Sequence, residues 1–274
     1  MEKKFAETRA ELLQLVNQER EVQKVSVLSV DPLATIVASA HAEEMAKGAF
    51  ASHWGLDGLK PYHRYSFAGG TDATQENISA VDNRSATRLA DLQQDASYLH
   101  VRLYQEKPPN DGHRRSILSP QHTHVGFGLA IDQLRLRLVE IFVAKYVQIR
   151  PMKRQLSRGA RVIFSGRLLK SSYVLHQVEV FDEPLPKPPP PEWFAVPRPY
   201  SLPDSSVALF PRLEPPLIYA DGRTGVIDVF EDGSFSVPIQ LHHGRPAIYT
   251  LVCWVKRRAS EKAFPATEVC LRAE

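Results

Sequence analysis

The stretch Asn110–Ala130, NDGHRRSILSPQHTHVGFGLA, is the most informative part of this sequence. Its first half, GHRRSIL, is followed by THVGFG, in which apolar and small residues begin to alternate as in a strand. Three shorter segments precede it: AHAEEMA at 40–46, SHWG at 52–55 and QENI at 75–78. Each segment alone is weak evidence for any particular fold. Their order along the chain makes the combined pattern more specific than any one of them.

In this order the segments resemble the CAP superfamily (cysteine-rich secretory proteins, antigen 5 and pathogenesis-related 1 proteins) in its bacterial SCP-like form. The resemblance covers roughly residues 8–148, about half of the chain. It implies an α-β-α sandwich for that half. It indicates a fold more firmly than an activity, because one fold hosts many functions.

Length and charge exclude several classes of protein. With 274 residues, the chain is long enough for two domains. Its 34 basic and 31 acidic residues leave a formal net charge of +3, so nucleic acid is not an expected partner. No apolar run approaches the roughly 18–20 residues needed to span a bilayer, and no transmembrane segment is predicted.

The first residues, MEKKFAETRAELLQLVNQERE, are too charged for a signal peptide. The protein is therefore intracellular, or its chain begins after a removed leader. Because the resemblance implies export, we expect the second case, with an extracellular, periplasmic or cell-surface location.

Residues 1–150 are predicted to form an α+β domain. Apolar side chains recur at helical spacing in three segments, 5–23, 32–47 and 85–105. Asp31-Pro32 is a typical helix start, with an N-cap and a proline at the first helical position. Period-two alternation in 124–131 and 135–147 predicts a β-hairpin that turns near Asp132-Gln133.

Residues 151–274 read as strands without a convincing helix, and we expect an all-β immunoglobulin-like sandwich there. The candidate strands are 160–169, 173–181, 224–230, 234–241, 247–255 and 267–272. Pro238 argues for an edge position or a bulge in its strand. Cys253 and Cys270 either form one disulfide across neighbouring strands or remain two buried thiols.

A proline-rich segment, 184–216, holds 12 of the chain's 21 prolines. KPPPPEW within it favours polyproline II. The segment is interpreted as a stiff crossover over the surface of the sandwich, with a partner-docking motif as the alternative. Its aromatic residues argue against a fully disordered linker.

In CAP proteins a central cleft holds two His and two acidic side chains. The resemblance places the first His at His53 of SHWG, the first Glu at Glu76 of QENI and the second His at His113 of DGHRR. The second acid is assigned to Asp111, with Glu106 as the fallback. A site of two His and one Glu is also possible, since bacterial relatives often lack the second acid.

Imidazole and carboxylate groups suit Zn²⁺ or another divalent cation, so His53, Glu76, His113 and possibly Asp111 are the candidate metal ligands. The same four residues are the catalytic candidates. Without metal, a His beside a Glu is a candidate proton carrier near neutral pH. The CAP-like half has no GxSxG nucleophile and no Cys, so a covalent acyl mechanism has little support.

Other polar residues are expected to be mainly structural. The residues considered are His41, Glu43, Glu44, His122, His124, Glu140, Arg114 and the pair His242-His243. Glu140 interrupts an apolar strand, so its carboxylate either faces solvent or joins the cleft network. Arg114 is expected to pair with a carboxylate and brace the cleft loop, and His242-His243 is expected to be an exposed turn.

Three functions remain open. The favoured one is a secreted or surface-exposed binding module whose cleft takes a divalent metal, a small lipid or a peptide, without catalysis. The alternatives are a hydrolase of peptidase type that uses His53, His113 and Glu76, and a structural or adhesive envelope protein.

Overall fold

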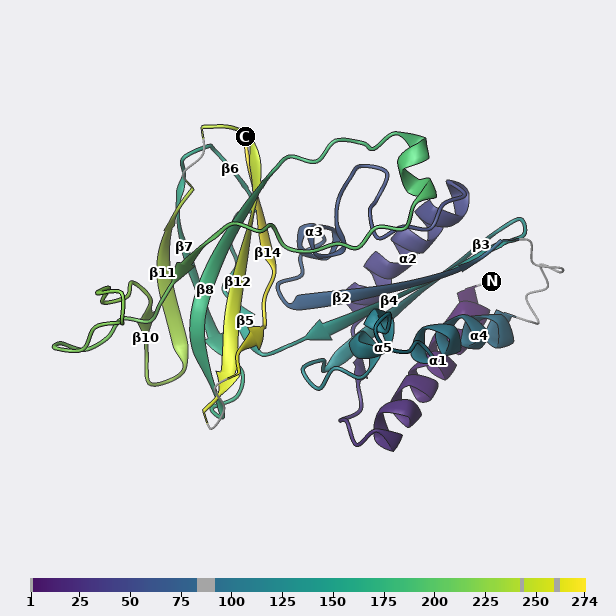
Figure 1. Cartoon of the computed structure of the whole chain (residues 1–274), viewed down its shortest axis with the longest axis horizontal. Helices are drawn as coiled ribbons and strands as arrows, with labels where there is room; N and C mark the ends of the chain where they lie inside the picture. The colour runs from purple at the N-terminus through teal and green to yellow at the C-terminus, as the bar shows by residue number, and fades with distance from the viewer. Residues whose placement is uncertain (1, 83–91, 242–243, 259–261) are drawn as a thin grey trace. The chain divides into compact units, whose positions relative to one another are not determined.

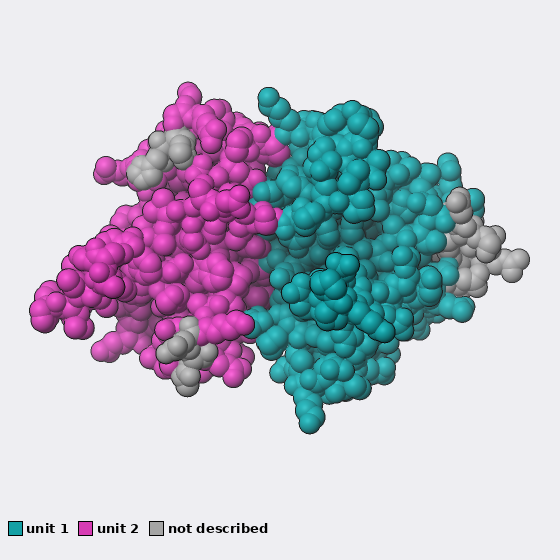
Figure 2. All heavy atoms as spheres, in the orientation of Figure 1, with its two compact units in different colours: residues 1–68, 74–143, 187–200 teal, residues 69–73, 144–186, 201–274 magenta. Residues whose placement is uncertain are grey.

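The computed structural model describes residues 2–82, 92–241, 244–258 and 262–274. Contacts within the chain divide it into two compact units (Figure 2). Unit 1 comprises residues 1–68, 74–143 and 187–200, and unit 2 comprises residues 69–73, 144–186 and 201–274.

The change of unit at residue 144 lies near the boundary predicted at 150, but neither unit is one continuous segment. Residues 69–73 pack with unit 2. Residues 187–200, from the middle of the proline-rich segment, pack with unit 1. The expectation that this whole segment crosses the sandwich surface is therefore wrong for residues 187–200.

Unit 1 contains a four-stranded sheet of order β1-β3-β4-β2. The strands are β1 (Ser29–Val30), β2 (Ala73–Val81), β3 (His124–Asp132) and β4 (Arg135–Ala144). β3 and β4 form the predicted antiparallel hairpin, in which Asp132 is paired with Arg135. β1 runs parallel to β3. β2 was not recognised in the sequence.

The helices are α1 (Glu2–Val22), α2 (Pro32–Lys47), α3 (Pro61–Phe67), α4 (Leu92–Tyr104) and α5 (Gly112–Ile117). The predictions of α1, α2 and most of α4 are confirmed, and the predicted start of α4 lies outside the described residues. Asp31 caps α2 as predicted, since its side chain accepts from Ala34 N–H at 2.5 Å. Among the described helices, none is both long and apolar enough to cross a membrane.

The sheet of unit 1 lies between two layers of helix (Figure 1). Alternation along β3 directs Val125, Phe127 and Leu129 into a core shared with α1 and α4. The intervening Gly126 and Gly128 face α2, whose backbone lies directly against them. The observed unit is an α+β fold in which one sheet has an apolar core on each face.

Unit 2 is built from strands and contains two sheets, of order β10-β11-β7-β5 and β6-β14-β12-β8-β9, with β13 paired to β12. The strands are β5 (Val147–Ile149), β6 (Gln155–Leu156), β7 (Arg161–Leu168), β8 (Tyr173–Pro184), β9 (Ser206–Leu209), β10 (Asp228–Val229), β11 (Ser234–Gln240), β12 (Ala247–Arg257), β13 (Phe264–Pro265) and β14 (Val269–Ala273). Side chains of both sheets, such as Phe235 and Leu251, share one core. Both sheets are open, and the immunoglobulin-like assignment stays a prediction.

Most strand predictions in unit 2 are confirmed, but the strand expected at 224–230 is reduced to Asp228–Val229. Pro238 lies at an edge as expected, because β10 pairs only with Phe235 and Ser236 of β11. Cys253 and Cys270 are both buried free thiols. They cannot meet across the β12–β14 ladder, where Cys270 is paired with Thr250.

We expect Gly128→Ala to destabilise the protein. A Cβ at this position would lie 2.1 Å from the backbone carbon and oxygen of Ala38 in α2, so the helix would have to move. Overpacking of a core typically costs 1–3 kcal/mol, and we expect about 3 kcal/mol here because the clash is with backbone. Chemical denaturation measures the loss. Gly112→Ala is the control, since nothing lies within 4 Å of the added atom, and equal stability of both variants would contradict this packing.

Candidate functional site

The site begins with Glu76, which β2 places in the interior of unit 1. Its side chain is fully buried, and its two oxygens have different partners. Oε1 accepts a hydrogen bond from His53 Nδ1 at 3.0 Å, and Oε2 pairs with Arg64 Nη2 at 2.7 Å. Both sequence candidates, His53 and Glu76, are therefore brought together.

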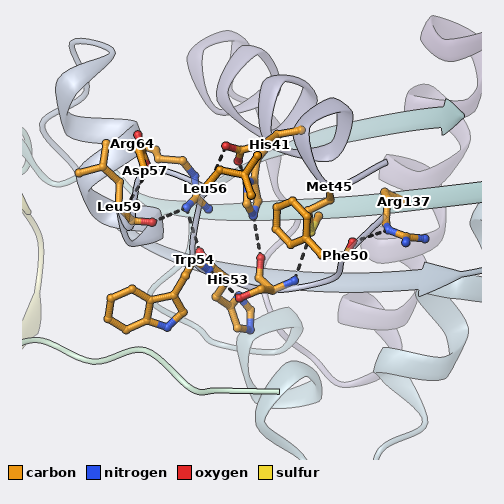
Figure 3. A network of polar contacts seen from close by, with 12 residues as sticks. His41, Met45, Phe50, His53, Trp54, Leu56, Asp57, Leu59, Arg64 and Arg137 are labelled. Carbon is orange, nitrogen blue, oxygen red and sulfur yellow. Dashed lines mark hydrogen bonds and ion pairs between the residues drawn. The ribbon is translucent and has the colours of Figure 1, made fainter. Parts of the chain in front are cut away.

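Arg64 was missed in the sequence and is central to the structure. It projects from α3 and donates to the carbonyls of His53 and Leu59, at 2.8 and 2.9 Å (Figure 3). It also donates to Glu76. One guanidinium therefore fixes the backbone of the SHWG loop and neutralises the buried acid. The short helix α3 offers too few turns to show a helical period, so the sequence carried little signal for it.

The charge of Glu76 is strongly stabilised. Burial by itself would raise the pKa of Glu76, but the charges of Arg64 and His41 and the hydrogen bond from His53 outweigh it and lower this pKa to about 2. Glu76 is therefore an anion at every physiological pH.

A second pair of His and carboxylate lies where α4 leads into α5. His113 Nδ1 lies 2.6 Å from Glu106 Oε1, and the His113 backbone N–H donates to Glu106 Oε2 at 3.0 Å. Asp111 instead pairs with Arg115 at 3.3 Å. Glu106, the fallback in the sequence analysis, is the acid beside His113, because its longer side chain reaches back from the preceding loop.

The two pairs face each other. The rings of His53 and His113 are stacked, with centroids 6.2 Å apart and an interplanar angle of 30°. Each Nδ1 is held by a carboxylate, which leaves Nε2 as the other ring nitrogen for binding or proton transfer. Within the described ranges, no group of three or more His, Cys, Asp and Glu side chains is arranged to hold one metal ion.

Tyr200 completes this arrangement and was also missed. Its ring lies 4.8 Å from that of His53, and its hydroxyl accepts a hydrogen bond from the Glu76 backbone N–H at 2.6 Å. Because Tyr200 is more than 120 residues away in sequence, no local pattern could have placed it there.

A buried ionic network lies on the other face of β2. His100 of α4 pairs with Glu140 at 2.6 Å and with Glu19 at 2.8 Å. Asn77 donates to Glu140 and to the carbonyl of His113, both at 3.2 Å. Glu140 therefore points inward, and Asn77 connects this network to the backbone of the His113 pair.

Burial alone would lower the pKa of His100, but Glu140 and Glu19 outweigh it and raise this pKa to about 10. His122 shows the opposite balance. Burial lowers its pKa to about 4, the hydrogen bond to Ser116 C=O opposes this, and the charge of Arg20 adds to the lowering. His122 is a packing residue, as expected.

The remaining candidates have local partners. His41 lies between Glu44 and the Ser52 carbonyl (Figure 3), and Glu43 pairs with Lys47 on the surface. His124 contacts the neighbouring Thr123 hydroxyl. Arg114 donates to the Tyr104 carbonyl and stacks on the Tyr104 ring, so the expected carboxylate partner is wrong. His242-His243 lies outside the described residues.

The layered α+β fold of unit 1 agrees with the sandwich that the sequence resemblance implies. Residues 13–146 match the model of the cysteine-rich secretory protein family, and this part of the chain belongs to the CAP superfamily. A search of the curated proteins gave no significant match.

The solved structures that are similar to part of the chain include two bacterial proteins. An outer surface protein from Borrelia burgdorferi is 16% identical, with a TM-score of 0.40, over 50% of this chain and 92% of that protein. An extracellular protein containing an SCP domain from Bacillus anthracis str. Ames is 20% identical, with a TM-score of 0.38, over 51% of this chain and 41% of that one.

The His100 network predicts a pH-dependent contribution to stability. Its folded pKa of about 10 lies above the ordinary value of 6.5, so the contribution is fully present below pH 6.5 and is lost as the pH rises through 10. His100→Gln leaves Glu140 and Glu19 without their cation, which should cost about 3 kcal/mol at pH 6.

Chemical denaturation of both proteins at pH 6 and pH 10 checks this prediction. The difference in unfolding free energy should be clearly smaller at pH 10. His124→Gln, at a half-buried position outside the network, is the control. A wild-type-minus-variant difference that is constant with pH would show that His100 is not held as a cation.

Proposed function

We propose that this chain is a secreted or cell-surface CAP protein whose unit 1 is a binding module for a divalent metal or a small ligand. The observation that carries the proposal is the pairing of His53 with Glu76 and of His113 with Glu106, with the two rings 6.2 Å apart. Export is proposed because of the family. Unit 2 is proposed to be an immunoglobulin-like sandwich that carries the binding module.

The pairs have the arrangement that commonly supports metal-binding histidines. A carboxylate that accepts from Nδ1–H fixes the tautomer and orients Nε2 toward a metal. With Zn–N bonds of about 2.0–2.1 Å, two imidazoles on one zinc have centroids roughly 5–6 Å apart. The observed separation of 6.2 Å is close to that range.

The carboxylates have a different role here from the one first expected. Glu76 is occupied by His53 and Arg64, so it orients His53 and is not proposed as a ligand. Glu106 has the same role toward His113, and Asp111 has none. Water or a bound ligand would supply the remaining positions, so the affinity for the metal alone should be moderate.

Binding is favoured over hydrolysis for a related reason. A general base works best when its pKa lies near the operating pH. Since Arg64, His41 and His53 hold the pKa of Glu76 near 2, this carboxylate is a poor proton acceptor. The hydrolase alternative would therefore have to use Glu106 and the histidines.

Calorimetric titration of the metal-stripped protein with Zn²⁺ tests the proposal. We expect one saturable site with a Kd in the micromolar range, about −8 kcal/mol. His53→Ala/His113→Ala should weaken binding by at least tenfold and leave the protein folded. His124→Ala is the matched control and should bind as the wild type. A folded wild-type protein that takes no zinc would remove the metal from the proposal.

A further inference from the structure

Residues 187–200 lie on unit 1 as an extended segment that contains a short 3-10 helix, Pro191–Ala195. Phe194 of this helix enters the core on the α2 side of the sheet and is 9% exposed. Its ring lies 4.7 Å from that of Phe50. A side chain from beyond residue 186 therefore completes a core of the CAP unit.

Two more aromatic side chains hold the segment near the candidate site. Trp193 packs edge-on against Trp54, with ring centroids 5.3 Å apart. The guanidinium of Arg198 lies over the Trp193 ring, 4.7 Å from its centroid. Tyr200 contacts His53 and the Glu76 backbone as described above. The receiving residues, Phe50, His53 and Trp54, are named here the aromatic face.

The chemistry of the segment is that of a docking peptide. Its sequence is KPPPPEWFAVPRPY, so six of its residues are prolines. Proline-rich peptides are already extended before they bind, lose little conformational entropy and commonly dock on aromatic surfaces. The segment contains no strand, and the contacts that place it on the aromatic face come from its side chains.

A groove open to solvent lies beside this contact. It has a volume of about 360 Å³ and lies between the segment and the loop after α2. Gly48, Phe50 and Leu56 line one side, and Pro189 and Phe194 line the other. The aromatic face is therefore continuous with an open surface groove.

We propose that the aromatic face is a binding surface for an extended peptide in which prolines precede two adjacent aromatic residues. Residues 187–200 are its occupant within the chain, and a partner peptide of the same chemistry takes their place. Displacement removes Tyr200 from His53 and opens the candidate site. The inference rests on the proposed function and deepens it by naming the ligand class.

Residues 187–200 are covalently linked to the aromatic face, so they compete with any free peptide that binds there. A segment linked to its own site acts at a high effective concentration, which the length and stiffness of the linking chain determine. A free peptide with the same contacts must exceed that competition. The wild-type chain should therefore bind such a peptide weakly, and a chain with a weakened segment should bind it much better.

The test measures fluorescence anisotropy of labelled KPPPPEWFAVPRPY with full-length proteins. The receiving protein carries Trp193→Ala and Phe194→Ala, and circular dichroism checks its fold. We expect saturable binding at least tenfold tighter than to the wild type. Trp193→Ala alone keeps Phe194 in the core and serves if the double variant does not fold; it should bind severalfold tighter than the wild type.

Two controls address specificity. The same peptide with alanine in place of Trp193 and Phe194 should not bind, although its prolines and Tyr200 are unchanged. In the weakened protein, a further Trp54→Ala should abolish binding, whereas Leu217→Ala, at an exposed position in unit 2, should not. Binding that survives Trp54→Ala would overturn the assigned surface.

Zinc titration of the same samples separates this inference from the proposed function. Zinc binding without peptide binding, in a folded protein with a weakened segment, overturns the peptide surface and leaves the metal proposal standing. Peptide binding without zinc binding supports the surface and removes the metal. If neither probe binds, both proposals fail.

Discussion

Glu76 is a carboxylate with no access to solvent, and a buried charge is tolerated only when it is paired and hydrogen-bonded. That requirement explains much of the local structure. Arg64 neutralises the charge and also holds the carbonyls of His53 and Leu59, so the loop that carries His53 cannot move independently of the acid. The position of His53 therefore follows from the hydrogen bonds and the ion pair that Glu76 requires in the interior.

β2 transmits this constraint through the sheet. Successive residues of a strand point to opposite faces, so Glu76 faces His53 while Asn77 faces the network of His100 and Glu140. Asn77 also bonds to the backbone of His113. Two adjacent residues of one strand therefore connect both His–carboxylate pairs, which lie on segments far apart in the sequence.

Residues 187–200 belong to unit 1, although they lie outside residues 13–146, which match the CAP family. Phe194 fills a place in the core and Tyr200 covers His53, although both follow the first strands of unit 2 in the chain. Two separate regions of sequence therefore contribute side chains around His53 and Glu76.

Much of unit 1 was predictable from sequence because its signals are local and periodic. The helices α1 and α2 and the β3–β4 hairpin show a repeat of 3.6 or 2 residues, and Asp31 marks a helix start that depends only on its neighbours. The ordered motifs also indicated the family, and the residues they proposed, His53, Glu76 and His113, lie close together. In unit 2, the alternation of apolar and polar residues predicted the long strands correctly, but it predicted a strand longer than the observed β10.

Tertiary structure alone decided which side chains meet. Asp111 is nearer to His113 in sequence, yet Glu106 pairs with it, because reach and direction in space decide a hydrogen bond. Arg64, Tyr200 and the partners of His100 were hidden for the same reason. Ion pairs and aromatic contacts between distant segments leave no periodic trace, since they depend on distance after folding, whereas helices and strands are determined by backbone geometry and the local alternation of apolar residues.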